Sequence, residues 1–153
     1  MTFHLAELNI ARLHEPLGHE ANKEFEAVLD AVNAIAEASD GFVWRLTDDN
    51  GKSSSYVEVY DDPNLIVNLS VWRDPDALRH FVYRSGHSSY LRRRKEWFAD
   101  TSTVDLVCWW VPAGHQPSVE EAVAKLDFLR SHGPSSAAFP FPELFNAPLD
   151  VQA

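Results

Sequence analysis

The sequence predicts an α+β fold, a ferredoxin-like split βαβ unit with an antiparallel sheet and helices on one face. Segments in which apolar and polar residues alternate, as in strands, are separated by segments whose apolar residues recur at helical spacing. Their order is strand, helix, strand, strand, helix, strand, helix, which is the order of a split βαβ unit. A third observation is that the central strand, residues 66–72, has two chemically different faces.

The composition predicts one soluble domain, residues 1–153, with a cytoplasmic location. The formal net charge of −10 argues against a nucleic-acid partner, whose phosphates require a basic surface, and against an anionic membrane. The amino-terminal residues do not resemble a signal peptide, and no apolar segment approaches the length of a membrane span. The single cysteine, Cys108, excludes an internal disulfide and fits a reducing compartment.

Residues 3–13 alternate and predict the first strand, with Ala6, Leu8 and Ile10 on one side. Glu7 and Asn9 lie on the other side. Apolar residues at helical spacing predict a helix over 21–38, which ends near Gly41. Residues 42–46 and 56–60 predict two further strands, separated by a turn at 48–51 and a polar loop.

The strand at 66–72 places Val67, Leu69 and Val71 on one side, which suits a face covered by helices. Asn68, Ser70 and Trp72 share the opposite side. This mixture of amide, hydroxyl and indole fits neither solvent nor a dry core, whereas small-molecule pockets combine apolar walls with a few polar groups.

The rest of the chain predicts two helical regions, a strand and a tail. Asp74 and Pro75 begin a helix that runs to about residue 83, and a further helical piece extends through residue 98. Residues 104–111 are apolar on both faces and predict a central strand. Ser118 and Glu121 form a capping box that begins the final helix. Residues 134–153 predict an aromatic tail that packs on the body or on a partner.

An open sheet face that carries Trp72 and Trp44 would be too apolar for a stable monomer. Two copies that pack these faces together would bury the patch and leave a cavity. The sequence therefore predicts a homodimer in the form of a dimeric α/β barrel.

Several blocks also resemble a known family in their order along the chain. These blocks are HLAELNIARL, GFVWRL, LIVNLSVWRDPDALRHFVYRSGH, LRRRKEWF, VCWWVPAGHQPSVEEAVAKL and LRSHGP. They resemble bacterial domain-of-unknown-function family 3291. That family is similar to the dimeric α/β-barrel superfamily, which includes antibiotic-biosynthesis monooxygenases and haem-degrading monooxygenases. The resemblance implies a fold and a set of reaction classes, but it names no substrate.

The resemblance also suggests catalytic residues. Cofactor-free monooxygenases of the superfamily use an Asn and a Trp on one strand face, and Asn68 with Trp72 look similar. The haem degraders use an Asn on the first strand, and an aromatic and a His on the helix after the Trp strand. Asn9 and His87 (or His80) are the nearest matches for the Asn and the His. The cofactor is therefore either none or haem, with His87 as the iron ligand in the second case. His87 follows Ser85-Gly86, so a role at the end of a helix is the alternative.

The ligand-binding candidates have structural alternatives as well. Asn9 and Asn68 would orient a polar group of a ligand in a pocket that Ser70, Trp72 and Trp44 line. Alternatively, the polar residues would form a network buried at the dimer interface. Tyr83 and Arg84 lie near the expected cavity mouth, where the guanidinium could bind a carboxylate or phosphate. A solvated helix face is the alternative for this basic region.

Two functional hypotheses follow. The first is a monooxygenase-like enzyme, cofactor-free or haem-dependent, that acts on a small apolar, aromatic or polyketide-like molecule. The second is a non-catalytic dimer that binds a ligand or a partner. The sequence has no glycine-rich phosphate loop, CxxC pair or HExxH motif, so nucleotide and structural zinc sites are not predicted.

Overall fold

The structure, a computed structural model, describes residues 2–47, 60, 62–84, 94–99 and 104–141. Its sheet has four strands in the order β2-β3-β1-β4, and each neighbouring pair is antiparallel. The strands are β1 (Phe3–Arg12), β2 (Phe42–Arg45), β3 (Leu65–Trp72) and β4 (Leu106–Pro112). The helices are the single turn η1 (Glu20–Asn22), then α1 (Lys23–Ala38), α2 (Pro75–Arg84), the short α4 (Arg94–Trp97) and α5 (Val119–His132).

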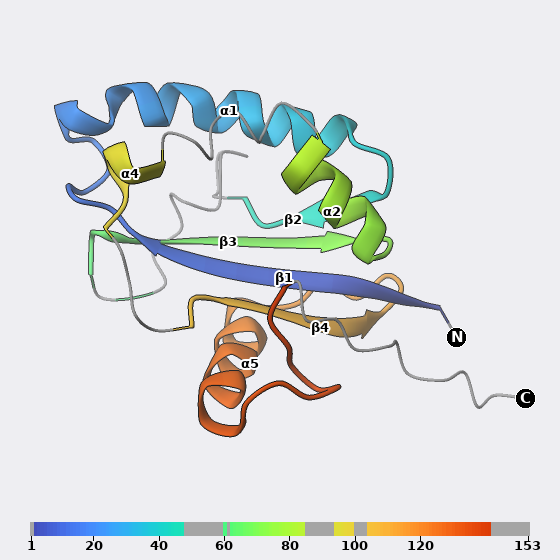
Figure 1. The fold of residues 1–153 in the computed structure, drawn as a ribbon. Coiled ribbons are helices and arrows are strands. Elements are labelled where there is room, and N and C mark those ends of the chain that lie inside the picture. The colour runs from blue at the N-terminus through green and yellow to red at the C-terminus, as the bar shows by residue number, and fades with distance from the viewer. Residues whose placement is uncertain (1, 48–59, 61, 85–93, 100–103, 142–153) are drawn as a thin grey trace, which may run out of the picture.

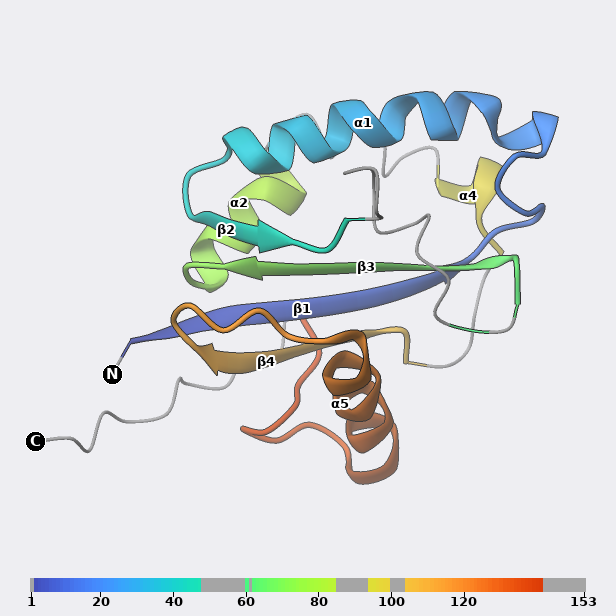
Figure 2. The ribbon, with the colours of Figure 1, turned by 180° about the vertical axis from the view of Figure 1, so that it is seen from behind.

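The helices lie on both sides of the sheet. Figure 1 shows α1 and α2 above the strands and α5 below them, and Figure 2 shows the same layers from behind. The strand order with α1 after β1 and α2 after β3 confirms the ferredoxin-like α+β fold. The helix α5 is an addition to that unit.

The pairing of β1 with β3 and β4 decides which side chains share a face, because residues directly opposite each other point to the same side. Leu5 lies opposite Trp72, Glu7 opposite Ser70, and Asn9 opposite Asn68. The face that carries these residues is called the mixed face, and it also includes Cys108, which lies opposite Glu7 on β4. The other side is called the aliphatic face and consists of Ala6, Leu8, Ile10, Val67, Leu69, Val71, Val107, Trp109 and Val111.

The aliphatic face forms the main core together with α5. Ala122 and Leu126 of α5 are fully buried against it, and each buried aliphatic side chain of this size stabilises the fold by about 1.5–3 kcal/mol. Ser118 caps the start of α5, since its hydroxyl accepts a hydrogen bond from the Glu121 N–H at 3.0 Å. The second half of the predicted capping box is not formed, because the Glu121 carboxylate contacts Trp109 Nε1 and His115 Nε2 instead. The helix ends at Gly133, whose φ of 77° is in the range that favours glycine.

The mixed face is covered by helices too, so the prediction of an open sheet face is wrong. Trp72 packs with residues of α1 and α2, while Trp44 and Trp109 belong to the core on the opposite face. Alternation along a strand shows which residues share a face, but it does not show which face a helix covers. The homodimer therefore stays a prediction. The open face of tryptophans from which it was predicted is not observed.

Strand β4 lies at the end of the order of four strands and not at its centre as predicted. Beyond it, Phe139 pairs with Cys108 through two backbone hydrogen bonds, at 2.7 and 2.9 Å. Phe139 covers β4 on the mixed face and α5 covers it on the aliphatic face, which explains why both of its sides are apolar.

The predicted strand at 56–60 lies outside the described residues except for Tyr60, which is not in a strand. Among the described helices, each is too short or too polar to cross a lipid bilayer.

Candidate functional site

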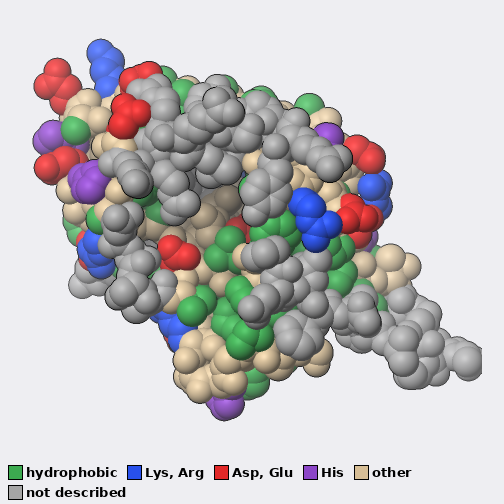
Figure 3. Space-filling view, viewed as in Figure 1, with side chains coloured by type: hydrophobic (Ala, Val, Ile, Leu, Met, Phe, Trp, Pro, Cys, Tyr) green, Lys and Arg blue, Asp and Glu red, His purple; other side chains and the backbone are tan. Residues whose placement is uncertain are grey.

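The mixed face is packed at both ends and open in the middle. At one end Leu5 and Trp72 are 0% and 1% exposed, and at the other end Ile66 is 7% exposed. Between them, Asn68 is exposed although it lies on an interior strand beneath a layer of helices. An exposed amide at that position shows that α1, α2 and α4 do not close over the centre of the sheet. Figure 3 shows the surface hollowed near its centre on this side of the molecule.

The closed end near α2 is built from aromatic rings. The ring of Trp72 stacks on Phe81 at 5.1 Å between centroids and meets Phe42 edge-on at 5.5 Å. The indole is therefore a packed wall and is nearly inaccessible to solvent. It still reaches the polar row, because its Nε1–H donates a hydrogen bond to the Ser70 hydroxyl at 3.0 Å.

The closed end near α4 is a separate apolar cluster. Phe25 of α1 lies 5.3 Å from Trp97 and 5.2 Å from Phe98, measured between ring centroids. Leu13 and Ile66 are buried in the same cluster. The two clusters hold α1 above the sheet at both of its ends, and they leave the cleft between them.

The floor of the cleft is the cross-strand pair Asn9 and Asn68. The Asn9 Oδ1 atom is buried and has no hydrogen-bond partner in the described structure. A buried polar atom without a partner costs about 1–3 kcal/mol, so it marks a place where a ligand or an ordered water belongs. Whichever way this amide is turned, a polar atom without a partner among the described residues remains at this buried position.

Helix α1, which lies above the mixed face, carries a second unpaired amide. Asn33 Nδ2 is buried and has no partner in the part of the chain that the structure describes. Asn33 lies one turn before Glu37, whose carboxylate accepts a hydrogen bond from Arg45 Nε of β2 at 2.7 Å. Arg45 lies opposite Ser70, so this side of α1 is tied to the mixed face. Helix α1 also carries half-buried apolar side chains, namely Val28, Leu29 and Val32.

Glu7 is a functional candidate that the sequence analysis did not single out. Its side chain is 6% exposed, and its Oε2 atom lies 3.1 Å from the Ser70 hydroxyl oxygen. Burial raises the pKa of Glu7 to about 8, although the hydrogen bond with Ser70 lowers it. The sequence contains a signal that could have identified Glu7: its carboxylate shares a strand face with Asn9, and its neighbours along the chain are apolar.

Cys108 lies beside Glu7 on β4 and is buried. Burial and the nearby charge of Glu7 raise the pKa of the Cys108 thiol well above its usual range. A thiol whose pKa is raised in this way is less reactive, because the thiolate is the reactive form.

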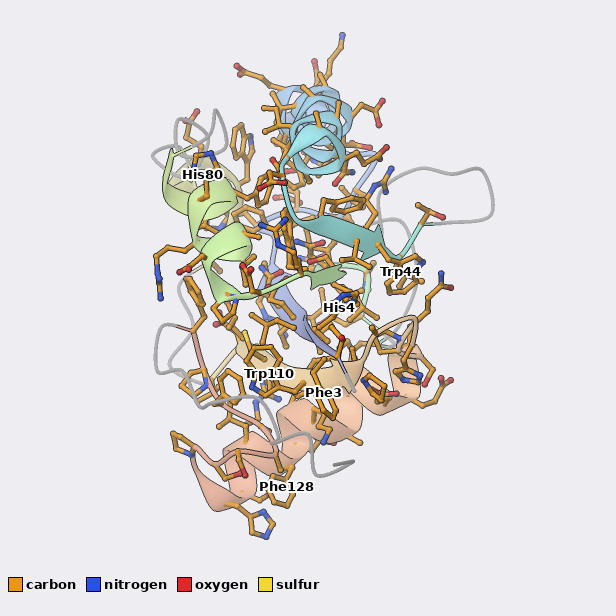
Figure 4. All side chains as sticks on the ribbon, turned by 90° about the vertical axis from the view of Figure 1, so that its right-hand side faces the viewer. Phe3, His4, Trp44, His80, Trp110 and Phe128 are labelled. Atoms are coloured by element: carbon orange, nitrogen blue, oxygen red, sulfur yellow. The ribbon has the colours of Figure 1, made fainter. Side chains whose placement is uncertain are left out.

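The structure brings Asn9, Asn68, Ser70 and Trp72 together, and it separates Trp44 from them. Figure 4 shows Trp44 beside β2, and its ring packs against the core of the aliphatic face. The other candidates are not located: His87 lies outside the described residues, and so do the side chains of Tyr83 and Arg84 at the end of α2. Among the described residues, no group of three or more His, Cys, Asp or Glu side chains could hold a metal ion.

Comparison with known proteins identifies a family and a shared fold. The sequence model of the family described as "Domain of unknown function (DUF3291)" matches residues 4–152. No curated protein matches the chain. Among solved structures, a protein of unknown function from Nitrosomonas europaea, NE2512, is 12% identical, with a TM-score of 0.51 over 76% of this chain and 97% of that chain.

Two further structures are similar at lower TM-scores. SnoaB, a cofactor-independent oxygenase from Streptomyces nogalater, is 19% identical, with a TM-score of 0.49 over 74% of this chain and 95% of that chain. A putative antibiotic biosynthesis monooxygenase from Chloroflexus aurantiacus is 12% identical, with a TM-score of 0.45 over 74% of this chain and 97% of that chain. At such low identities a structural likeness concerns the fold.

Proposed function

The chain belongs to the DUF3291 family, and we propose that it binds a small aromatic or polyketide-like molecule in the cleft above Asn9 and Asn68 and acts on it as a monooxygenase. The observation that carries the binding proposal is the cross-strand amide pair on an otherwise covered face, in which Asn68 is exposed and the Asn9 Oδ1 atom is buried without a partner among the described residues. The reaction class comes from the resemblance of the sequence to the dimeric α/β-barrel monooxygenases.

The chemistry of the cleft favours a ligand with an apolar body and one oxygen-bearing group. The amides of Asn9, Asn33 and Asn68 can each donate and accept hydrogen bonds, so they can orient a hydroxyl or a carbonyl. Aliphatic side chains of α1 and the aromatic clusters at both ends offer apolar walls. Pockets of this composition hold small molecules by shape and fix their orientation through a few polar contacts.

Cofactor-free oxygenation suits such a site. A phenol or enol that loses its proton becomes an electron-rich anion, which can reduce O₂ directly. One oxygen atom enters the product and the other leaves as water. The amides would hold the oxygen of the substrate, and the packed ends would exclude water from the reacting carbon.

The binding proposal is tested with a matched pair of probes, 1-naphthol and naphthalene, titrated against the tryptophan fluorescence of the protein. Asn68→Ala should weaken 1-naphthol binding about five- to thirtyfold, as expected for loss of a hydrogen bond worth about 1–2 kcal/mol. Naphthalene has no oxygen, so its affinity should change by less than about twofold. Gln116→Ala removes an exposed amide outside the cleft and should leave both affinities unchanged. Equal effects of Asn68→Ala on the two probes would contradict the proposed orientation by the amides.

The reaction is tested by O₂ consumption with a polycyclic phenol such as anthrone. Uptake that is lost in Asn68→Ala supports the cofactor-free enzyme. Binding without O₂ uptake in the protein alone or after addition of haem would favour the non-catalytic ligand-binding protein instead. A Soret band after addition of haem, abolished by His87→Ala, would favour the haem-dependent enzyme.

A further inference from the structure

The buried carboxyl of Glu7 stands at the boundary between the packed aromatic end of the mixed face and the open cleft. It lies between Leu5, which is fully buried, and Asn9, which is on the cleft floor. Ser70 lies opposite Glu7. Asn68 lies two residues before Ser70, on the same face of β3. The Glu7–Ser70 pair is therefore the last pair before the amide pair of Asn9 and Asn68.

Among the described residues, no cationic side chain is paired with Glu7. On β4 it faces the thiol of Cys108, and α1, α2 and Phe139 contribute apolar side chains to the surrounding cluster. The nearest strand beyond Ser70 carries Arg45, and that guanidinium is paired with Glu37 of α1. With no positive charge to offset desolvation, the carboxyl is protonated at neutral pH, because its pKa is raised to about 8.

A protonated Glu7 changes the hydrogen bonding of Ser70. A serine hydroxyl has two acceptor sites and one proton. The Trp72 Nε1–H occupies one acceptor site at 3.0 Å, and a carboxylic O–H of Glu7 at 3.1 Å occupies the other. The Ser70 proton is then free to be donated toward the cleft. When Glu7 is ionised, Ser70 donates its proton to the carboxylate, and this donor is lost.

We infer that the cleft binds its ligand as an oxygen anion, such as an enolate, phenolate or carboxylate, and that protonated Glu7 makes this binding feasible by directing the Ser70 hydroxyl proton to the ligand. This inference rests on the proposed function and narrows its substrate to molecules that present an anionic oxygen. A carboxylic acid kept neutral in an apolar site is a known way to stabilise such an oxygen. Glu7 is a positioning residue here, because it acts through Ser70.

The experiment compares an anionic probe with its neutral isostere, 2-naphthoate with 2-naphthamide, by fluorescence titration of the whole protein from pH 6 to 9.5. In the wild type, the affinity for 2-naphthoate should fall about tenfold between about pH 7 and pH 9, as Glu7 loses its proton. The affinity for 2-naphthamide should fall by less than about threefold over the same range. Glu7→Gln, which does not titrate, should make the 2-naphthoate profile flat.

Two further variants test whether Ser70 and Glu7 cause the pH dependence of 2-naphthoate binding. Ser70→Ala should weaken 2-naphthoate binding at pH 7 by at least about fivefold, because the donor is absent. If Ser70→Ala binds 2-naphthoate with wild-type affinity, the Ser70 hydroxyl does not donate to the ligand and the inference is overturned. Cys108→Ala should keep the wild-type pH profile, and a flat profile in this variant would assign the titration to the thiol and overturn the role of Glu7. Melting temperatures confirm that each variant is folded.

The outcomes distinguish this inference from the proposed function. If the wild type binds both probes with no pH dependence, the role of Glu7 is overturned and the ligand-binding function stands. If neither these probes nor 1-naphthol bind at any pH, the proposed function falls and the inference falls with it.

Discussion

At the scale of single residues, the most consequential feature is an acid buried in the sheet. Glu7 loses its hydration on folding and gains a hydrogen bond with Ser70 in return. Burial dominates, since the pKa rises from 4.5 to about 8. The native state therefore binds a proton that the unfolded state has already released between these two pH values.

This difference predicts how stability depends on pH. The contribution of Glu7 is most favourable below about pH 4.5, where both states are protonated, and it is lost as the pH rises to about 8. The total loss is about 4–5 kcal/mol, because each unit of pKa shift corresponds to about 1.4 kcal/mol. Denaturant unfolding of the wild type and Glu7→Gln at several pH values checks this. The difference between the two proteins should change by that amount, and parallel profiles would show that Glu7 is ionised in the folded protein.

The sequence predicted part of the site at this scale. Period-two alternation placed Asn68, Ser70 and Trp72 on one face, and the expected pairing with the first strand brought Asn9 to the same face, as observed. Glu7 was not recognised as a site residue, because an acid on a strand is ordinarily assigned to solvent. Asn33 was missed because it lies within the apolar stripe of a helix, where one amide does not change the helical pattern.

At the scale of elements, the junction between β2 and α2 depends on a glycine. Gly41 has a φ of +87°, and a Cβ atom at this position would collide with the Cβ of Ala77 in α2. Its carbonyl oxygen also accepts a hydrogen bond from the Arg73 N–H at 2.7 Å, which joins the start of β2 to the end of β3. The glycine thus lets α2 approach close enough to pack Phe81 on Trp72.

Gly41→Ala should therefore reduce the free energy of unfolding by more than a glycine replacement that introduces backbone strain alone. We expect a loss of at least about 2–3 kcal/mol, from an unfavourable positive φ together with the displacement of α2. Gly114→Ala is the matched control, because Gly114 has a φ of +92° with no atom within 4 Å of the added Cβ. Its cost should be about 1 kcal/mol. Denaturant midpoints measure both, and equal losses would contradict a close contact at Gly41.

The elements themselves were largely predictable, and their environment was not. The cap at Ser118 marked the start of α5 in the sequence, because caps are local features. The first helix was predicted from residue 21, and α1 begins at Lys23 after the single turn η1. Coverage of a face depends on contacts between distant segments, which explains why β4 was wrongly predicted to be central.

At the scale of the whole molecule, α5 decides which surfaces are left for association. On the aliphatic face, α5 packs against β1 and β4. The mixed face holds the cleft and lies under α1 and α2. The homodimer stays a prediction from the sequence, and light scattering at micromolar concentration tests whether it forms.

The covering role of α5 gives the last prediction. Leu126 is fully buried between α5 and the aliphatic face, so Leu126→Asp places a carboxylate in an apolar core. The loss of packing and the cost of the buried charge together should exceed about 4 kcal/mol, enough to detach the helix from the sheet. The strands that α5 covers, β1 and β4, carry six core residues of the aliphatic face, and contiguous apolar surface of this kind drives association. Light scattering should therefore show an increased mass for Leu126→Asp.

The control is Ala124→Asp, at an exposed position of the same helix, which should keep the mass of the wild type. If the leucine variant keeps both the mass and the melting temperature of the wild type, α5 does not hold this face closed.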